Sequence, residues 1–473
     1  MFDLRQAFDW LPQAVIFGTG AEVVQAVCTD TRLVRAGDLF VALRGEKYDA
    51  HDFIDEAIRG GAAAIVVERW SERMTPPALL VPDSRKALGW IAAGWRRRFS
   101  LPVIAVTGSN GKTTVKEMIG SILSAHVGTP AAFATRGNLN NDVGVPMTLL
   151  SLTDAHRAAV IELGMNHMGE IAWLASLVKP KVALVNNAQR EHQEFLSGPE
   201  ATAVENGAVI GELDDDGVAV FPGDDLCTGI WRGLAQGRRT IEFGLTPAQA
   251  VHAAAQARPA RFTATLDGRQ LEIQLGIAGR HNVRNALAAA ACAHAIGVPF
   301  EAIAAGLAAF KPVAGRLRRL RGMAGFELID DTYNANPDSV RAAIDVLADE
   351  AAPRLLVLGD MGEVGTQGPQ FHHEVGAYAR ERGIDRLLAV GDMTRETVLA
   401  FGEGAAHFES VQALIESLKT APAAAGIASP ADGASGFASV LVKGSRFMRM
   451  ERVVTALVAP AVAGAASPSQ GAH

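Results

Sequence analysis

The sequence predicts an α/β protein built from three domains. Short apolar runs rich in β-branched residues alternate with amphipathic helical stretches along the chain, which is the pattern of sheets covered by helices. The chain has 473 residues, more than one hydrophobic core normally organises. Stretches with proline and glycine near 76–82 and 311–316 read as a linker and a hinge, so we place the domains at 1–83, 84–312 and 313–473.

Composition narrows the class of protein. Hydrophobic residues make up 49% of the chain and charged residues 20%, and no run of about 18 apolar residues marks a membrane span. The formal net charge of −7 argues against a broad nucleic-acid surface. The N-terminus is too acidic for a secretion signal, and the isolated Cys28, Cys227 and Cys292 suit buried thiols. We therefore expect a cytoplasmic protein with no nucleic-acid partner and no membrane insertion.

The stretch 101–114, LPVIAVTGSNGKTT, predicts a phosphate-binding loop between a strand and a helix. Gly108 and Gly111 let the backbone turn so that consecutive N–H groups face one concavity, to which the new helix adds its positive end. Lys112 supplies a mobile charge for the β- and γ-phosphates, and the Thr113 hydroxyl is suited to hold Mg²⁺.

One position departs from the general loop pattern G-x-x-x-x-G-K-[ST]. That pattern has glycine at position 106, where this chain has Val106, and the loop glycine comes late, at Gly108. An ordinary strand-to-helix turn is the alternative, but the flanking strand and helix favour a nucleotide site.

Two further apolar runs end in side chains that could complete this site. The run 158–164 carries Glu162 near its end, where a neighbouring parallel strand would place a Mg²⁺ ligand; a helix N-terminal acid is the alternative. The run 181–185 is followed by His192, for which a solvated loop histidine is equally suitable. The loop 137–142, which precedes both runs, holds more amides than a turn requires: Asn138, Asn140 and Asn141.

The first unit reads as a small α/β domain. Strands are expected at 38–45 and 62–68, on either side of a short helix at 51–60. Ahead of them, the hydroxyls and arginine of 29–32 suit a diphosphate, although a capped turn with a surface arginine is the commoner reason for such a cluster.

The third unit predicts a doubly wound, Rossmann-like sheet. Apolar runs at 326–329, 355–358, 387–390 and 438–442 alternate with helices. Ligands gather at the carboxyl ends of such strands, although helix caps are the alternative reason for polar residues there. The residues at these ends include Asp331, Asn334, Asn336, Lys443 and Ser445.

Ahead of this unit, the stretch 279–286 opens an alanine-rich helix that continues to about 296. Asn285 lies near the start of this helix, where an asparagine normally caps it. An amide also offers the paired donor and acceptor that the edge of adenine requires, so both roles are open.

Five stretches together resemble the Mur ligases: TGSNGKTT at 107–114, IELGMNHMGEI at 161–171, GRHNVRNALAA at 279–289, DDTYNANPDS at 330–339 and LGDMGE at 358–363. The resemblance spans all three units, although the phosphate loop alone is shared with folylpolyglutamate synthetases. NANPDS, with GNLNNDVGVP at 137–146 and LVKGSRFMRME at 441–451, is similar to the MurF type within the family.

The resemblance implies an ATP-dependent, ADP-forming ligase that uses Mg²⁺. Its substrates would be UDP-N-acetylmuramoyl-tripeptide, activated as an acyl phosphate, and D-alanyl-D-alanine. It also implies a UDP-substrate-binding first domain, an ATP-binding central domain and a C-terminal ligase domain. We expect a monomer, although the sequence itself leaves the oligomeric state open. A MurE-like or folylpolyglutamate synthetase-like ligase and, outside this class, a regulatory P-loop NTPase are the alternatives. The third residue of the tripeptide, diaminopimelate or lysine, is left open.

The resemblance also assigns roles to individual residues. Lys112, Glu162 and His192 match catalytic positions, and Thr113, Glu162 and His192 match metal ligands. ATP contacts fall on Thr107, Gly108, Ser109, Asn110, Gly111, Lys112, Thr113, Thr114, Asn285, Arg316 and Asp331. Substrate contacts fall on Thr31, Arg32, Gly45, Asp49, His51, Asn138, Asn140, Asn141, Asn334, Asn336, Lys443 and Ser445.

One residue departs from what the resemblance implies. In many Mur ligases a lysine fourteen residues after the metal-binding histidine is carbamylated and helps hold a second Mg²⁺, but here that position is Asn206. An amide cannot form a carbamate. We therefore expect activity that does not depend on bicarbonate. Either the second ion binds weakly, Asn206 supports it through water, or a nearby acid such as Glu205 replaces the carbamate.

Overall fold

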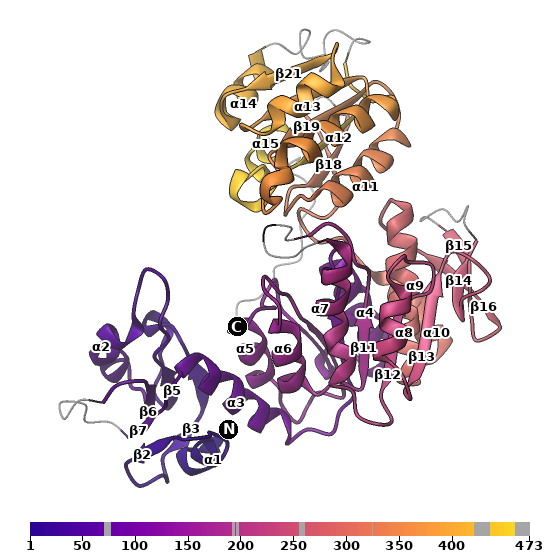
Figure 1. The fold of residues 1–473 in the computed structure, drawn as a ribbon. Coiled ribbons are helices and arrows are strands. Elements are labelled where there is room, and N and C mark those ends of the chain that lie inside the picture. Colours follow the sequence, from indigo (N-terminus) through magenta and orange to yellow (C-terminus); the bar gives the residue numbers. More distant parts are fainter. Residues whose placement is uncertain are drawn as a thin grey trace, which may run out of the picture.

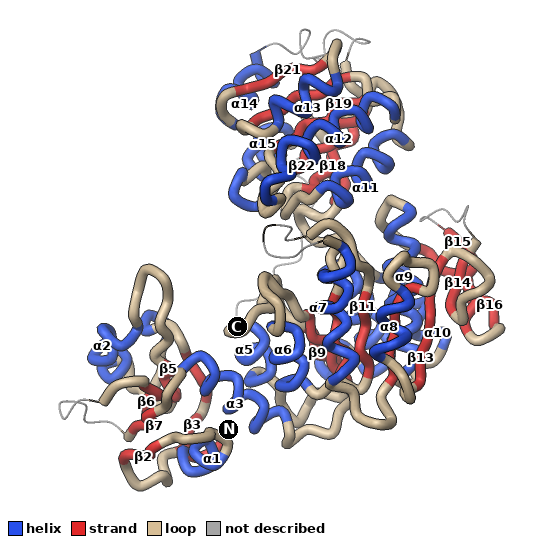
Figure 2. The backbone as a smooth tube through the Cα atoms, in the orientation of Figure 1, coloured by secondary structure: helices blue, strands red, loops and turns tan. Residues whose placement is uncertain are grey.

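The computed structural model describes residues 1–70, 77–191, 194, 198–254, 261–323, 325–420 and 436–458. These residues form three lobes in chain order, each built on its own sheet with helices packed around it (Figures 1 and 2). The predicted α/β class with three domains is confirmed. The predicted boundaries at 83/84 and 312/313 fall between the sheets. The exact residues at which one domain ends and the next begins stay a prediction.

The N-terminal lobe contains a five-stranded sheet in the order β2-β7-β6-β5-β4. One expectation is wrong here: the proline-rich segment near 76–82 is not simply a linker, because residues 78–80 form a strand between β2 and β6. Prolines at the ends of this strand leave its own N–H groups available for pairing. The elements of the lobe are β1 (Phe2–Asp3), α1 (Leu4–Asp9), β2 (Val15–Phe17), β3 (Val23–Val24), β4 (Ala26–Cys28), β5 (Asp38–Val41), α2 (Ile54–Arg59), β6 (Ala64–Val67) and β7 (Ala78–Leu80).

The central lobe holds a nine-stranded sheet in the order β16-β15-β14-β13-β12-β11-β8-β10-β9. Its strands run parallel from β9 to β14, and the last two form an antiparallel hairpin. The strands are β8 (Val103–Thr107), β9 (Ala132–Ala134), β10 (Ala158–Glu162), β11 (Val182–Val185), β12 (Val218–Pro222), β13 (Arg239–Gly244), β14 (Val251–Ala253), β15 (Arg261–Leu266) and β16 (Arg269–Gln274). The helices are α3 (Ser84–Arg96), α4 (Lys112–Val127), α5 (Gly144–Leu150), α6 (Glu170–Val178), α7 (Pro199–Gly211), α8 (Thr228–Leu234), α9 (Arg280–Ala295) and α10 (Phe300–Ala309).

The C-terminal lobe has a six-stranded sheet in the order β17-β18-β22-β19-β20-β21, parallel except for the edge strand β17. The four predicted strands are present, and β17 and β21 extend the sheet at its edges. The strands are β17 (Arg318–Arg321), β18 (Glu327–Asp331), β19 (Arg354–Gly359), β20 (Arg386–Val390), β21 (Ala405–Phe408) and β22 (Ser439–Lys443). The helices are α11 (Pro337–Ala348), α12 (Gly368–Glu381), α13 (Thr394–Phe401), α14 (Val411–Thr420) and α15 (Glu451–Leu457).

Buried apolar clusters cross the lobe boundaries. One cluster joins the first lobe to the central sheet, where Gly94 of α3 lies so close to Trp10 that a Cβ there would come within 2.1 Å of the indole ring. Another joins the central and C-terminal lobes, and a Cβ on Gly279 would come within 2.9 Å of Val346 on α11. The lobes are therefore packed against one another through apolar side chains as well as through loops.

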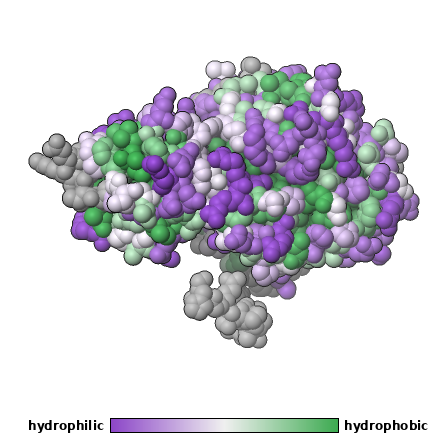
Figure 3. Space-filling view, turned by 90° about the horizontal axis from the view of Figure 1, so that it is seen from below, coloured by the Kyte–Doolittle hydropathy of each residue, from purple (hydrophilic) through white to green (hydrophobic). Residues whose placement is uncertain are grey.

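No described helix is both long and apolar enough to cross a bilayer. On the face seen in Figure 3, hydrophobic side chains are interspersed with hydrophilic ones.

A charged clamp joins the central and C-terminal lobes. Arg190, in the loop after β11, forms ion pairs with Asp338 of α11 at 2.7 Å and with Glu374 of α12 at 2.8 Å. Its guanidinium also lies 5.1 Å from the centre of the Phe371 ring. The hydrogen bond from Arg190 lowers the pKa of Glu374. Glu374 therefore stays charged, and the clamp stays intact, down to a pH below the ordinary pKa of a glutamate.

Replacing Arg190 with alanine is expected to loosen the C-terminal lobe. The change removes both ion pairs and leaves two carboxylates facing one another, although Arg341 still pairs with Glu374. Small-angle scattering should show a larger radius of gyration than for the unchanged protein. The control is Arg232→Ala, because Arg232 pairs with Glu242 within the central lobe. Identical scattering of the Arg190 variant and the unchanged protein would contradict the expectation.

Candidate functional site

The predicted phosphate loop lies between β8 and α4, at the carboxyl end of the central sheet. Gly108 and Gly111 have φ angles of 127° and 82°, which favour glycine. At Gly111 a Cβ would also come within 2.7 Å of the Asn285 amide. The two glycines are therefore required both by the turn and by the close approach of α9.

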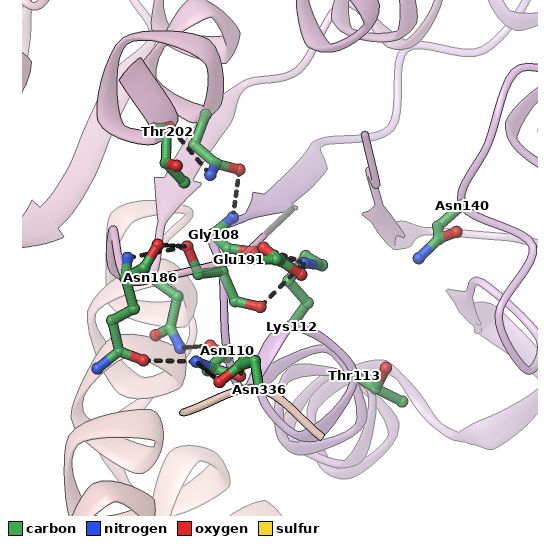
Figure 4. Close-up of polar contacts among 12 residues, drawn as sticks. Gly108, Asn110, Lys112, Thr113, Asn140, Asn186, Glu191, Thr202 and Asn336 are labelled. Atoms are coloured by element: carbon green, nitrogen blue, oxygen red, sulfur yellow. Dashed lines mark hydrogen bonds and ion pairs between the residues drawn. The ribbon is translucent and has the colours of Figure 1, made fainter. Parts of the chain in front are cut away.

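The side chain of Asn206, on α7, binds the backbone of this loop. Its Oδ1 accepts a hydrogen bond from the Gly108 N–H at 2.8 Å, and its Nδ2 donates to the Thr202 carbonyl; Gly108 and Thr202 are labelled in Figure 4. The Asn206 side chain is buried. The hydroxyl of Thr107 is also buried and bonds to the carbonyls of Leu184 and Asn206. Thr107 and Asn206 thus support the loop, and neither lines the cavities described below.

Glu205 is occupied elsewhere. Its two carboxylate oxygens accept hydrogen bonds from the N–H groups of Gly169 and Ile171, at 2.8 and 2.9 Å, at the start of α6. Neither side chain lines the cavities described below, so two of the alternatives do not hold in this arrangement: support of the second ion by Asn206 through water, and replacement of the carbamate by Glu205. Both side chains bind backbone groups. Their directions could not be predicted from the positions of the two residues along α7.

Asn206→Ala is expected to destabilise the loop and not to remove a metal. The change leaves the buried Gly108 N–H without its acceptor, which costs about 1–3 kcal/mol. Thermal unfolding should show a lower midpoint, whereas the Mg²⁺ concentration needed for half-maximal activity should stay within a factor of about two, since no ion ligand is removed. A large rise in the Mg²⁺ requirement at unchanged stability would contradict this assignment.

The side chain of Lys112 folds back onto the loop. Its Nζ donates to the carbonyls of Gly108 and Ser109, at 2.6 and 3.1 Å, and forms an ion pair with Glu191 at 3.0 Å (Figure 4). Glu191 follows β11, so two neighbouring parallel strands bring the acid and the lysine together. Both side chains are largely shielded from solvent.

Glu162 stands beside the loop at the end of β10, as predicted. Its Oε1 accepts hydrogen bonds from Asn140 at 2.8 Å and from the Thr113 hydroxyl at 3.2 Å. Its Oε2 has no hydrogen-bond partner, although Glu162 is only 1% exposed and water therefore cannot easily replace one. An unpartnered carboxylate oxygen next to a hydroxyl fits a divalent cation, which prefers such oxygen ligands.

The predicted third metal ligand, His192, lies outside the described residues. Among the described residues no group of three or more His, Cys, Asp and Glu side chains could by itself hold a metal ion. The oxygen pair of Thr113 and Glu162 is therefore the part of the predicted metal site that can be described.

A cavity of about 630 Å³ opens beside the loop, between the central and C-terminal lobes. Asn285 lines it and belongs to a chain of amides: it donates to Asn282 at 2.9 Å and accepts from Asn186 at 3.0 Å. Asn186 also donates to the Asn110 carbonyl, and its Oδ1 is buried without a partner. Asn285 does not cap its helix, because it lies within α9, whose N-cap position is Gly279.

Across the same cavity the C-terminal lobe contributes three charged residues that were predicted from sequence. Lys443 is buried and pairs with Asp331 at 2.5 Å; burial lowers the pKa of its ammonium, and the Asp331 carboxylate opposes this. Arg316 lies 4.0 Å from the centre of the Tyr333 ring, and its Nε is buried without a hydrogen bond. The two lobes thus share one site.

A smaller cavity of about 210 Å³ adjoins the loop and is lined by Lys112, Thr113, Glu162 and Glu191. Arg316 and Lys443 line both cavities. The lobes also touch directly here, because the side-chain amides of Asn110 and Asn336 exchange hydrogen bonds of 2.9 and 3.3 Å (Figure 4). A ligand that fills both cavities would therefore contact the loop and the C-terminal lobe at once.

The other predicted substrate residues near the loop have structural partners. The Oδ1 of Asn141 accepts a hydrogen bond from the N–H of Gly144, the first residue of α5, at 2.8 Å, and Asn138 is exposed. Ser445 accepts from the Gly362 N–H at 2.6 Å, and the carbonyl of exposed Asn334 accepts from Lys443. Asn140, Asn141, Asn334 and Asn336 line the smaller cavity, whereas Asn138 and Ser445 do not.

The residues predicted for the first domain lie in the N-terminal lobe, apart from both cavities. Arg32 is exposed and pairs with Asp30, whose pKa it lowers to about 2. The Thr31 hydroxyl bonds to Glu56. Both ring nitrogens of the buried His51 are engaged, by Asp49 and by the Glu68 N–H, so His51 shapes the loop that begins near Gly45.

Sequence reasoning missed two sets of residues in this region. The loop residues Arg190 and Glu191 carried no motif, and charge alone could not say which lobe each would face. Asp224 and Arg284 form a bidentate pair, at 2.6 and 2.9 Å, on the wall of the larger cavity. An aspartate two residues after the end of β12 was the available signal for this pair.

Comparisons with known proteins agree across the chain. Three family models match. The model "Mur ligase family, catalytic domain" matches residues 23–96, "Mur ligase middle domain" matches 106–293, and "Mur ligase, glutamate ligase domain" matches 315–446. The chain is 42% identical to the UDP-N-acetylmuramoyl-tripeptide–D-alanyl-D-alanine ligase of Escherichia coli, over 93% of this chain and 95% of that protein. It is 33% identical to the protein of that name from Bacillus subtilis, over 92% and 93%.

Solved structures show the same likeness. MurF from Acinetobacter baumannii superposes with a TM-score of 0.87 at 35% identity, covering 96% of this chain and 98% of that one. MurF from Thermotoga maritima, in complex with ADP, gives 0.79 at 26% identity, covering 92% and 97%. With family models that match all three lobes and relatives of this identity over most of its length, the chain belongs to the Mur ligase family and is of the MurF type.

Proposed function

We propose that this chain joins D-alanyl-D-alanine to UDP-N-acetylmuramoyl-tripeptide with conversion of ATP to ADP, in the cytoplasmic synthesis of peptidoglycan precursors. The observation that carries the proposal is the shared site, in which the phosphate loop faces Arg316, Asp331 and Lys443 from the other lobe. The E. coli relative is named for this reaction, and the Thermotoga neighbour is in complex with ADP.

The chain's own residues suit the transfer of a phosphoryl group to a carboxylate. Lys112 is placed to neutralise the transferred group, and Arg316 adds a second cation from across the cavity. The amides of Asn186 and Asn285 offer donors and acceptors for the base of the nucleotide. The resulting acyl phosphate would then be attacked by the amine of the dipeptide, with loss of phosphate.

Thr113 and Glu162 would hold Mg²⁺, because the unpartnered Oε2 of Glu162 is an oxygen ligand already buried beside the threonine hydroxyl. Mg²⁺, when bound, neutralises charge on the phosphate oxygens. Asn140 holds Glu162 in place through its hydrogen bond to Oε1. We keep His192 as a further proposed ligand on the family resemblance alone.

The test is ADP release measured with each substrate omitted in turn. A ligase requires both UDP-N-acetylmuramoyl-tripeptide and D-alanyl-D-alanine, whereas a regulatory NTPase requires neither. Mass spectrometry should detect the UDP-N-acetylmuramoyl-pentapeptide. Parallel assays with the diaminopimelate and lysine tripeptides decide the third residue, and removal of bicarbonate should leave the rate unchanged. ADP release at the same rate without the dipeptide would contradict the proposal.

A further inference from the structure

The ammonium group of Lys112 has no hydrogen-bond donor to spare. It carries three N–H donors, and these face the carbonyls of Gly108 and Ser109 and the carboxylate of Glu191, at 2.6, 3.1 and 3.0 Å. The side chains of Lys112 and Glu191 are 13% and 12% exposed, so water does not supply an easy exchange partner. A phosphate oxygen can bind Lys112 only if one of these acceptors leaves.

Glu191 is the acceptor that can leave. The two carbonyls belong to a backbone pinned by the hydrogen bond from Gly108 N–H to Asn206 and by that from Ser109 N–H to the Asn187 carbonyl, at 2.8 and 3.2 Å. The Glu191 carboxylate, in contrast, ends a side chain with three rotatable bonds. Rotation about these bonds would move the carboxylate away from Lys112 without moving either carbonyl.

The released carboxylate would stay in the cavity. The preceding backbone is fixed by two hydrogen bonds: Gln189 N–H donates to the Ser109 hydroxyl at 2.9 Å, and Arg190 N–H donates to Asp338 at 2.9 Å. Glu191 and Glu162 line the same 210 Å³ cavity, and Oε2 of Glu162 is buried without a partner. Two carboxylates and a phosphate in so small a space repel one another unless a cation lies among them.

We propose that Glu191 exchanges partners: it is the counter-ion of Lys112 in the empty site and becomes a ligand of a divalent cation once nucleotide phosphates occupy the loop. The inference rests on the proposed function, since it needs a nucleotide to displace the carboxylate. It assigns to this chain a carboxylate ligand in the place where Asn206 and Glu205 supply none. Oxygen ligands of this kind suit Mg²⁺ and its paramagnetic substitute Mn²⁺.

Two binding measurements on Glu191→Gln and Glu191→Ala test the exchange. In EDTA, calorimetric titration with a non-hydrolysable ATP analogue should show binding about fivefold tighter than for the unchanged protein, because an ion pair no longer competes for Lys112. With Mn²⁺ and the same analogue, electron paramagnetic resonance should count one bound ion fewer in each variant. Without the analogue, the variants and the unchanged protein should bind equal numbers of ions.

The matched control is Glu212→Gln, which removes a surface pair with Lys179 of similar length, 2.8 Å. Its nucleotide affinity and ion count should equal those of the unchanged protein. The proposal is overturned if either Glu191 variant keeps the full ion count, or if its affinity in EDTA is unchanged while its thermal unfolding is normal. If the unchanged protein binds no nucleotide at all, the proposed function fails as well, so the two failures are distinguishable.

Discussion

Lys112→Ala is expected to abolish ligase turnover while leaving the fold intact. The lysine is the loop's mobile cation, and removing one electrostatic partner of a transition-state charge costs on the order of 10³-fold in rate. The loss should appear mainly in kcat, because the charge on the phosphoryl group changes between the bound ground state and the transition state, and Lys112 would stabilise the latter more. The measurement is ADP release with all three substrates at saturation.

Two features of the structure shape the control for this variant. Without Lys112 the Glu191 carboxylate loses a cation, so the thermal midpoint must be measured beside the rate. Lys179→Ala removes a lysine from a surface ion pair and should keep full activity. Turnover of the Lys112 variant within tenfold of the unchanged protein would show that the loop lysine is not the phosphate-binding cation.

Glu162→Gln is expected to lower kcat/KM by at least about 100-fold and to raise the Mg²⁺ requirement, since even residues that only support a metal ligand are worth 10–100-fold. The substitution is nearly isosteric. The amide oxygen can still accept from Asn140 and Thr113, whereas the unpartnered Oε2 becomes an NH₂ group that cannot bind a cation. A Mg²⁺ titration of the rate, with the variant's thermal midpoint as a check, measures the effect.

Asn140→Ala is the companion to this test, because it removes the hydrogen bond that orients Glu162 but leaves the carboxylate. Its loss should be smaller, and higher Mg²⁺ should recover part of it. If Glu162→Gln keeps an ordinary Mg²⁺ requirement, the cation is held by other groups.

The site could be predicted from sequence wherever a strand end fixed a side chain. Lys112, Thr113 and Glu162 follow or end neighbouring parallel strands, so the topology that the apolar runs predicted brings them together. Arg316, Asp331 and Lys443 were assigned from motifs of the third unit, and they line the cavity from the opposite lobe.

Side-chain direction could not be predicted in the same way. Asn206 falls where a metal ligand was expected, yet the orientation of α7 turns its amide under the loop toward Gly108. Glu191, in contrast, was not predicted as a site residue, because nothing in its loop sequence indicated that its carboxylate would reach Lys112. The strand β7 was missed because the prolines around it resemble a linker, and only three residues, 78–80, pair with the neighbouring strands.

The apolar clusters that cross the lobe boundaries have a consequence for expression of separate fragments. A fragment that ends near residue 312 would expose the face of α9 and its neighbours that packs near Val346, and a fragment lacking the first 83 residues would uncover the groove at Gly94 that holds Trp10. Large exposed apolar patches drive self-association. Isolated lobes should therefore aggregate when produced alone, and melting of the intact chain should follow one transition seen by probes placed in different lobes.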